Sequence, residues 1–173
     1  FIAFTGAMDY WANVDAVIWF ADKVWPQLHE AFPKLKFYIV GGKPHEDVSA
    51  LAQREGIVVT GRVEDIRPYI THALVCIAPM RIARGIQNKV LEAMASGKAT
   101  VVTSMAADGI DLPAGQQRYI CDDPESFLAG TLDLIKNKAL ASSVGQENRD
   151  KIVSHYHWDN TLSPLFDMFG ADI

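Results

Sequence analysis

Short apolar runs alternate with amphipathic stretches along almost the entire chain. The apolar runs are brief and rich in β-branched or aromatic residues, which predicts strands at residues 1–5, 37–40, 57–61, 74–79, 99–103 and 118–121. The amphipathic stretches predict helices at residues 13–32, 47–55, 66–72, 88–96, 124–137, 140–155 and 159–169. Within the first of these helices, Pro26 is expected to cause a kink or to begin a second segment.

This order of elements predicts an α/β fold. Strands that read as continuous apolar runs, separated by helices, are typical of a parallel sheet covered by helices on both faces. We therefore expect a doubly wound, Rossmann-like sheet followed by C-terminal helices. Ligands of such sheets bind beyond the carboxyl ends of the strands, where the strand order reverses. The loops around Gly6 and at residues 79–88 and 104–111 are accordingly where a site is expected.

Composition narrows the class of protein. The chain has 173 residues, enough for one domain with a substantial core, and its net charge of −5 argues against nucleic acid as a partner. No apolar run approaches the roughly 20 residues of a membrane span. Cys76 and Cys121 lie within apolar runs, so we expect buried free thiols. The chain opens directly on a core strand without an initiator Met, and we expect it to be a domain excised from a larger protein.

The stretch from residue 79 to residue 97 carries the most chemistry. It leads from a strand into a helix, so free backbone N–H groups and the positive end of the helix dipole face the loop. Gly85 allows a ligand to approach the backbone, and Glu92, one turn into the helix, can accept hydrogen bonds from a ribose diol. The same residue types also suit a surface ion pair between Lys89 and Glu92 among solvated loop charges. Three cations lie within nine residues of this stretch, namely Arg81, Arg84 and Lys89.

A longer pattern contains this stretch. Residues 91–102 read Leu-Glu-Ala-Met-Ala-Ser-Gly-Lys-Ala-Thr-Val-Val, which resembles the donor-site signature of the large group 1 family of retaining glycosyltransferases with the GT-B fold. That family includes many lipopolysaccharide and exopolysaccharide sugar transferases. The resemblance spans nearly the whole chain and covers the C-terminal, donor-binding half of such an enzyme. Further motifs of the family follow in order, at Phe4-Thr5-Gly6, Asn13-Val14-Asp15, Ile39-Val40-Gly41-Gly42, Val59-Thr60-Gly61-Arg62-Val63 and Tyr156-His157-Trp158.

The resemblance implies an organisation and a reaction. Residues 1–173 would form the nucleotide-sugar (donor) binding domain, and the N-terminal acceptor domain would be absent from this chain. The enzyme would move a sugar from a nucleoside diphosphate sugar to a saccharide or lipid-linked acceptor, in exopolysaccharide or cell-surface glycan synthesis. Neither a metal nor a cofactor is expected beside the donor substrate. The resemblance further implies a cytoplasmic enzyme, allows peripheral membrane association of the full-length protein, and leaves this domain alone inactive.

The resemblance also implies roles for individual residues. Arg81 and Lys89 would hold the diphosphate during catalysis, and Glu92 would bind the ribose hydroxyls. Many members carry an earlier glutamate, with seven residues between it and this one. The present chain has Arg84 at that position, so the charge expected near the donor sugar is reversed. Asp108-Gly109 also suits a plain turn. The remaining donor contacts that the resemblance implies are Gly6, Arg84, Gly85, Ile86, Asp108 and Gly109.

Two other functions fit a chain of this architecture. One is half of a nucleotide-sugar epimerase, which would need catalytic acids and a histidine on both domains. The other is a non-catalytic domain that binds a nucleotide sugar, and Arg84 in place of the usual glutamate is the feature that favours it. The helix at residues 91–97, together with the Pro79–Arg81 loop, fits the transferase better than the epimerase.

Overall fold

The computed structural model describes residues 1–156. The predicted helix at residues 159–169 and the last two residues of the motif at 156–158 lie outside this range. The strands are β1 (Ile2–Thr5), β2 (Phe37–Val40), β3 (Ile57–Gly61), β4 (Val75–Ala78) and β5 (Thr100–Val102). The helices are α1 (Trp11–Lys23), α2 (Trp25–Ala31), α3 (Glu46–Ala50), the 3₁₀ turn η1 (Leu51–Gln53), α4 (Arg67–His72), α5 (Asn88–Ala95), α6 (Ser104–Ala107), α7 (Ala114–Gln117), α8 (Pro124–Lys136) and α9 (Lys138–His155).

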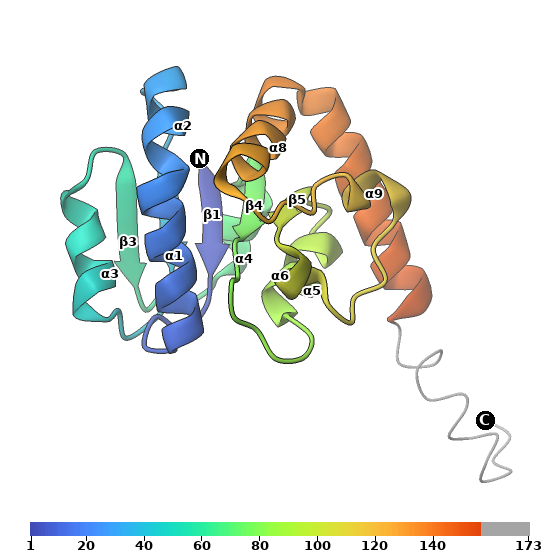
Figure 1. Ribbon diagram of the computed structural model, residues 1–173. Helices are drawn as coiled ribbons and strands as arrows, with labels where there is room; N and C mark the ends of the chain where they lie inside the picture. Colours follow the sequence, from blue (N-terminus) through green and yellow to red (C-terminus); the bar gives the residue numbers. More distant parts are fainter. Residues whose placement is uncertain (157–173) are drawn as a thin grey trace, which may run out of the picture.

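The described strands form one parallel sheet in the order β3-β2-β1-β4-β5 (Figure 1). Phe4 of β1 lies beside Ile39 of β2, and Ala3 lies beside Cys76 of β4. The chain therefore adds β2 and β3 on one side of β1 and then returns to add β4 and β5 on the other. This reversal beside β1 is the place where doubly wound sheets bind ligands. The predicted fold class is confirmed.

Helices cover both faces of the sheet because alternate strand residues are apolar on each side. Ile2 and Phe4 belong to the core beneath α1 and α8, whereas Ala3 packs with Ile70 of α4 and Ala93 of α5. Figure 1 shows α1 in front of the sheet and α4 behind it. On the α1 face, aromatic rings join two helices and a strand, with centroid distances of 5.8 Å between Phe20 and Phe127 and 4.8 Å between Phe20 and Phe37.

Two prolines begin helices, as the sequence predicts. Pro26 lies in the first turn of α2, so the predicted helix at residues 13–32 is two segments that join at Val24. Pro124 opens α8, whose N-cap residue Asp123 accepts a hydrogen bond from the backbone N–H of Ser126 at 2.9 Å. Proline suits a first turn because its missing N–H has no intrahelical partner there.

Both cysteines are free and buried, as expected. Cys76 lies within β4, and burial raises the pKa of its thiol to about 12. A thiol with so high a pKa stays protonated at neutral pH, so Cys76 acts as a small apolar core residue.

The predicted strand at residues 118–121 is wrong. Only an isolated bridge joins Val102 to Ile120 in this stretch, and α7 occupies the preceding residues. The edge of β5 is instead covered by the buried Gln116 side chain, which accepts from the Thr100 N–H at 3.0 Å and donates to the Thr100 carbonyl at 2.6 Å. One amide side chain thus satisfies both backbone groups that a sixth strand would have paired at Thr100.

Helix α9 holds the end of α5 in place. Gly97 ends α5 with a φ of +69°, and Gly145 of α9 lies so close that a Cβ built on it would be 2.1 Å from the Gly97 carbonyl oxygen. The Arg149 guanidinium donates to the carbonyl of Ala95 at 2.7 Å. Cations near a helix C-terminus stabilise its unpaired carbonyls. The orientation of α5, which matters for the site described below, is therefore set by a close contact between two backbones.

Candidate functional site

A pocket of about 540 Å³ opens at the carboxyl edge of the sheet. It lies beyond the ends of β1 and β2 and beside the start of α5, next to the point where the strand order reverses. Its lining combines exposed backbone, apolar side chains and two opposite charges. The lining residues are Thr5, Gly6, Ala7, Tyr10, Asn13, Val40, Gly41, Gly42, Ile66, Ile86, Gln87, Asn88, Lys89 and Glu92.

Glycines form the part of the wall between β1 and β2. The Gly6 N–H donates to the Val40 carbonyl at 3.0 Å, and the Met8 N–H donates to the Gly42 carbonyl at 3.0 Å. A Cβ on Gly41 would lie 1.7 Å from the Gly6 carbonyl oxygen, so no other residue fits there without moving the backbone. The two loops are thereby locked together, and a ligand can approach the backbone closely.

The opposite wall is the first turn of α5. The N-cap residue of α5 is Gln87, whose side chain makes no cap and instead donates from its amide to the Gly85 carbonyl at 3.0 Å. The first N–H groups of the helix therefore lack a side-chain acceptor, and the positive end of the helix dipole lies at the pocket. Such a helix end is suited to bind an anion.

Lys89 places a cation in the same turn. Its ammonium donates to the Asn13 side-chain oxygen, lies 3.5 Å from the Met80 sulfur, and lies 4.4 Å from the centroid of the Phe4 ring. Within residues 1–156 no carboxylate pairs with it. Desolvation lowers the pKa of Lys89 to about 8, and the charge of Glu92 opposes this shift. Lys89 is therefore still protonated at neutral pH without being neutralised by a salt bridge.

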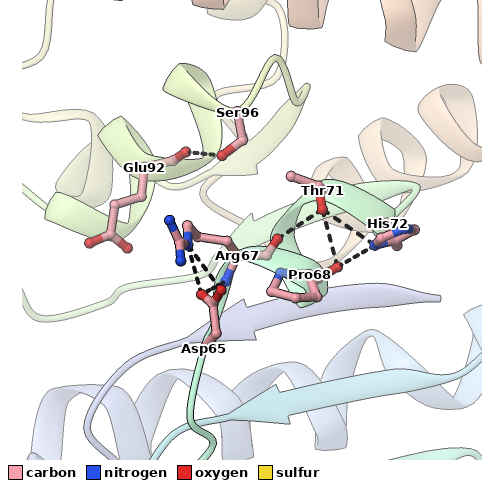
Figure 2. A network of polar contacts seen from close by, with 7 residues as sticks. All are labelled: Asp65, Arg67, Pro68, Thr71, His72, Glu92 and Ser96. Carbon is pink, nitrogen blue, oxygen red and sulfur yellow. Dashed lines mark hydrogen bonds and ion pairs between the residues drawn. The ribbon is translucent and has the colours of Figure 1, made fainter.

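Glu92 lies one turn further along α5 and also lines the pocket. Figure 2 shows its side chain extending away from Ser96, whose hydroxyl donates to the Glu92 backbone carbonyl at 2.8 Å. Burial raises the pKa of the Glu92 carboxyl, and the charge of Lys89 lowers it in opposition. No ion pair joins Glu92 to Lys89 or to any other residue of the range 1–156. The alternative of a surface pair is thus not what the structure shows.

The Asp65–Arg67 pair stands separately at the start of α4. The Arg67 Nε lies 2.9 Å and 3.0 Å from the two carboxylate oxygens of Asp65 (Figure 2). The hydrogen bonds from Arg67 lower the pKa of Asp65. The Arg67 guanidinium is thus paired with Asp65 and not with Glu92. The Glu92 carboxylate therefore stays available to a ligand.

Sequence comparison shows the family of this chain. A model of the family described as glycosyl transferases group 1 matches residues 1–137. The chain belongs to this family. The predicted resemblance is therefore confirmed over most of the chain.

This group 1 chain is also similar to individual proteins, one by sequence and two by fold. A 44.6 kDa protein of the cps region of Klebsiella pneumoniae is 23% identical over 173 residues, covering 95% of the chain and 45% of that protein. A variant of S. aureus TarM, solved with fondaparinux, α-GlcNAc-glycerol and UDP, superposes with a TM-score of 0.81 at 16% identity over 98% of the chain and 35% of TarM. The C-terminal domain of the group 1 protein LpcC from Francisella tularensis gives 0.72 at 16% identity, covering 91% and 85%. The group 1 chain thus spans less than half of the first two proteins.

The structure gathers some of the predicted site residues of the group 1 chain into the pocket and leaves others outside. Gly6, Ile86, Lys89 and Glu92 line it together. The predicted residues that are not among its lining are Arg81, Arg84, Gly85, Asp108 and Gly109.

Arg81, predicted to hold the diphosphate, is engaged elsewhere. Its guanidinium forms a two-pronged pair with the Asp15 carboxylate, with an Nε–Oδ2 distance of 3.0 Å. This hydrogen bonding raises the pKa of Arg81 and neutralises its charge locally. Arg84 is exposed and forms no hydrogen bond within residues 1–156, so it borders the site as a solvated cation.

Gly85 and Gly109 occupy positions that only glycine adopts easily, with φ angles of +67° and +75°. A Cβ on Gly109 would lie 3.3 Å from the Ile86 side chain, so the loop that carries Asp108 touches the rim of the pocket through Ile86. These residues shape the entrance, whereas the lining itself is formed by others.

Asn13, Tyr10 and Ile66 line the pocket, although the sequence did not predict them as site residues. Asn13 was visible only as part of a motif, although a polar residue on the apolar stripe of α1 is a signal in its own right. Tyr10 and Ile66 had no distinguishing signal, because they reach the pocket from loops whose course the sequence does not determine.

Two further features concern metals and membranes. Within residues 1–156 no three His, Cys, Asp or Glu side chains lie close enough together to hold a metal ion. No helix in that range is long and apolar enough to span a bilayer.

Proposed function

We propose that this chain is the donor-binding domain of a retaining glycosyltransferase that uses a nucleoside diphosphate sugar. The observation that carries the proposal is the pocket itself. At the reversal point of the sheet it combines a glycine backbone wall, an uncapped helix N-terminus, an unneutralised cation at Lys89 and a free carboxylate at Glu92. A diphosphate and a ribose need these two kinds of group side by side.

Lys89 and Glu92 would contact different parts of the ligand. The diphosphate would lie against the first turn of α5, accepting hydrogen bonds from its N–H groups and from the Lys89 ammonium. The ribose hydroxyls would donate to the Glu92 carboxylate one turn further along. Apolar side chains of Tyr10, Ile66 and Ile86 would pack against the rings of the ligand.

Catalysis would use the same groups. When the bond between sugar and diphosphate breaks, the leaving diphosphate gains negative charge, and groups that are already in place stabilise it. Removal of one such donor typically slows an enzyme by about 10²–10³-fold. Arg81 and Arg84 stay predictions in this scheme, because a contact of Arg81 with the diphosphate would require it to leave or share Asp15.

The reaction as a whole needs an acceptor, which we propose to be a saccharide or a lipid-linked saccharide. The relative from a cps region supports a role in exopolysaccharide or cell-surface glycan synthesis. The UDP bound to the TarM variant makes UDP the first nucleotide to test, followed by GDP. We propose a cytoplasmic enzyme whose acceptor site lies on another domain, with peripheral membrane association of the whole protein. This chain alone is then expected to bind donor without transferring sugar.

Nucleotide binding should depend on pH through Lys89. The free ammonium has a pKa of about 8, so its charge is present at pH 7 and is lost as the pH rises through 8. Bound diphosphate favours the charged form and therefore raises the pKa of Lys89 in the complex. Affinity should fall as the pH rises from the pKa of Lys89 in the free chain to its pKa in the complex. Calorimetric titration with UDP and with GDP in EDTA, from about pH 6.5 to about pH 9.5, measures the effect.

The variant Lys89→Met removes the cation and should weaken binding at pH 7 by at least about tenfold, because charge-assisted hydrogen bonds contribute about 1.5–3 kcal/mol. It should also abolish the fall in affinity above pH 8. Lys136→Met, at the exposed end of α8, is the matched control and should leave both the affinity and its pH dependence unchanged. Equal affinities for Lys89→Met and the unaltered chain at every pH would contradict the assignment of the diphosphate to Lys89.

A further inference from the structure

We infer that Asn13 is a positioning residue of this site, whose side chain holds the Lys89 ammonium at the wall of the pocket where the diphosphate binds. The inference rests on the proposed function for the identity of the ligand. The link between the two side chains is independent of it and can be measured without any ligand.

The Asn13 side chain is held in place by contacts other than the one with Lys89. It is 6% exposed, and its amide nitrogen donates to the Ala7 carbonyl at 2.9 Å. Because the nitrogen is committed to that carbonyl, the oxygen of the amide faces Lys89 and accepts from its ammonium. The N-cap residue of α1 is Tyr10, so Asn13 is not used to cap its own helix.

Gly6 makes room for this arrangement. A Cβ on Gly6 would lie 2.7 Å from the Asn13 amide nitrogen, closer than any real side chain permits. The absence of a side chain at Gly6 therefore serves the placement of Asn13 as well as the approach of a ligand. Gly6 follows β1, whereas Asn13 and Lys89 belong to α1 and α5, and the three residues all line the pocket.

An amide suits this position better than a carboxylate. The elements around the ammonium present neutral groups, namely Asn13 from α1, the Phe4 ring from β1 and the Met80 sulfur from the loop after β4. Glu92, on α5 itself, is the charged group whose field acts on Lys89. A neutral acceptor orients the ammonium while its positive charge stays available to a diphosphate.

The neighbouring pair shows the contrast. Asp15 lies two residues after Asn13, and its carboxylate neutralises Arg81 in the loop after β4. One side chain of α1 thus pairs with a cation as a carboxylate, and the other as a neutral amide. Asp15 neutralises Arg81 and ties the loop to α1, whereas Asn13 orients Lys89 and leaves its charge for a ligand.

The test measures the titration of Lys89 directly. In the chain labelled with ¹³C-lysine, the Cε resonance of Lys89, assigned by its loss in Lys89→Met, is followed against pH without nucleotide. Asn13→Asp should raise the pKa of Lys89 by about one unit, because a carboxylate stabilises the ammonium. Asn13→Leu should lower the pKa by a similar amount, since the acceptor is gone. Both should weaken UDP or GDP binding at pH 7 by about tenfold, the first by competing with the diphosphate and the second by releasing the ammonium.

The control is Asn88→Asp, which adds the same charge beside Lys89 but away from the bonded atom. Its effect on the pKa of Lys89 should be less than half that of Asn13→Asp. Asn13→Asp keeps the shape of the side chain and loses the hydrogen bond to the Ala7 carbonyl, whereas Asn13→Leu loses both hydrogen bonds. Circular dichroism therefore establishes first that each variant is folded. A Lys89 pKa that is the same in Asn13→Asp and in the unaltered chain would overturn the inference. If the pKa moves as expected while the folded chain binds neither nucleotide, the proposed function is what fails.

Discussion

Gly145→Ala is expected to destabilise the chain by about 3 kcal/mol, although the same change in the middle of a helix normally stabilises by about 0.5–1 kcal/mol. Gly145 lies inside α9, where alanine has the higher helix propensity. The added Cβ would lie 2.1 Å from the Gly97 carbonyl oxygen, 2.8 Å from the Gly97 carbonyl carbon and 3.3 Å from the Ala99 nitrogen.

All three of these atoms belong to the backbone, so no rotamer change can relieve the contact. Either α9 moves away from α5, or the turn at Gly97 opens, and both outcomes disturb the helix that carries Lys89 and Glu92. Urea denaturation followed by circular dichroism should show a lower midpoint with an unchanged slope.

Gly130→Ala in α8 is the matched control. A Cβ at that position would lie 3.3 Å from the Cys121 sulfur and 3.5 Å from a Tyr119 ring atom, which are side-chain neighbours that can adjust. It should be neutral or slightly stabilising. Equal stability of Gly145→Ala and the unaltered chain would show that α9 does not lie against Gly97 as described.

Gln116→Leu is expected to cost about 3 kcal/mol, because it leaves two buried backbone groups of Thr100 without partners at about 1–3 kcal/mol each. Gln116 is fully buried, and its amide pairs with both the N–H and the carbonyl of Thr100. It also accepts from the Asn148 side chain of α9 at 2.8 Å, so its loss affects the sheet edge and α9 together.

The neighbouring exposed Gln117 provides the control. Its exposed side chain donates to the Leu112 carbonyl at 2.9 Å in a part-buried hydrogen bond, which is the one bond that the change removes, so Gln117→Leu should cost about 1 kcal/mol. Thermal unfolding by calorimetry compares the two. A cost for Gln116→Leu as small as that for Gln117→Leu would mean that the edge of β5 finds other partners.

The fold could be predicted from the sequence because parallel strands buried on both faces are continuous apolar runs. The runs at residues 37–40 and 57–61 coincide with β2 and β3, and Pro26 and Pro124 mark helix starts. The run at residues 118–121 reads Arg-Tyr-Ile-Cys, which also suits a strand, yet it forms only a bridge. Composition alone cannot show that the Gln116 side chain pairs with Thr100, so that this stretch meets β5 only at Val102.

The site could be predicted only where it is local in sequence. Ile86, Lys89 and Glu92 belong to one loop and the helix that follows it, so their spacing places them together. The contact between Asn13 and Lys89 joins residues 76 positions apart, and that between Asp15 and Arg81 joins residues 66 apart. Residue spacing cannot reveal such pairs, because they depend on how α1 packs beside the loop after β4. For this reason Arg81 looked available to a phosphate in the sequence and is paired in the structure.

The most direct test of the central claim is whether Glu92 and a ribose hydroxyl recognise each other. UDP and GDP are titrated calorimetrically in EDTA against the folded chain and against Glu92→Ala, each beside the 2′-deoxy nucleotide, with Glu125→Ala as control. For the nucleotide that binds, loss of the 2′-hydroxyl should weaken binding to the unaltered chain and to the control by about tenfold, and should have no effect on Glu92→Ala. Full affinity of Glu92→Ala, or no binding of either nucleotide by the folded chain, would contradict the assignment of this pocket to a nucleotide-sugar donor.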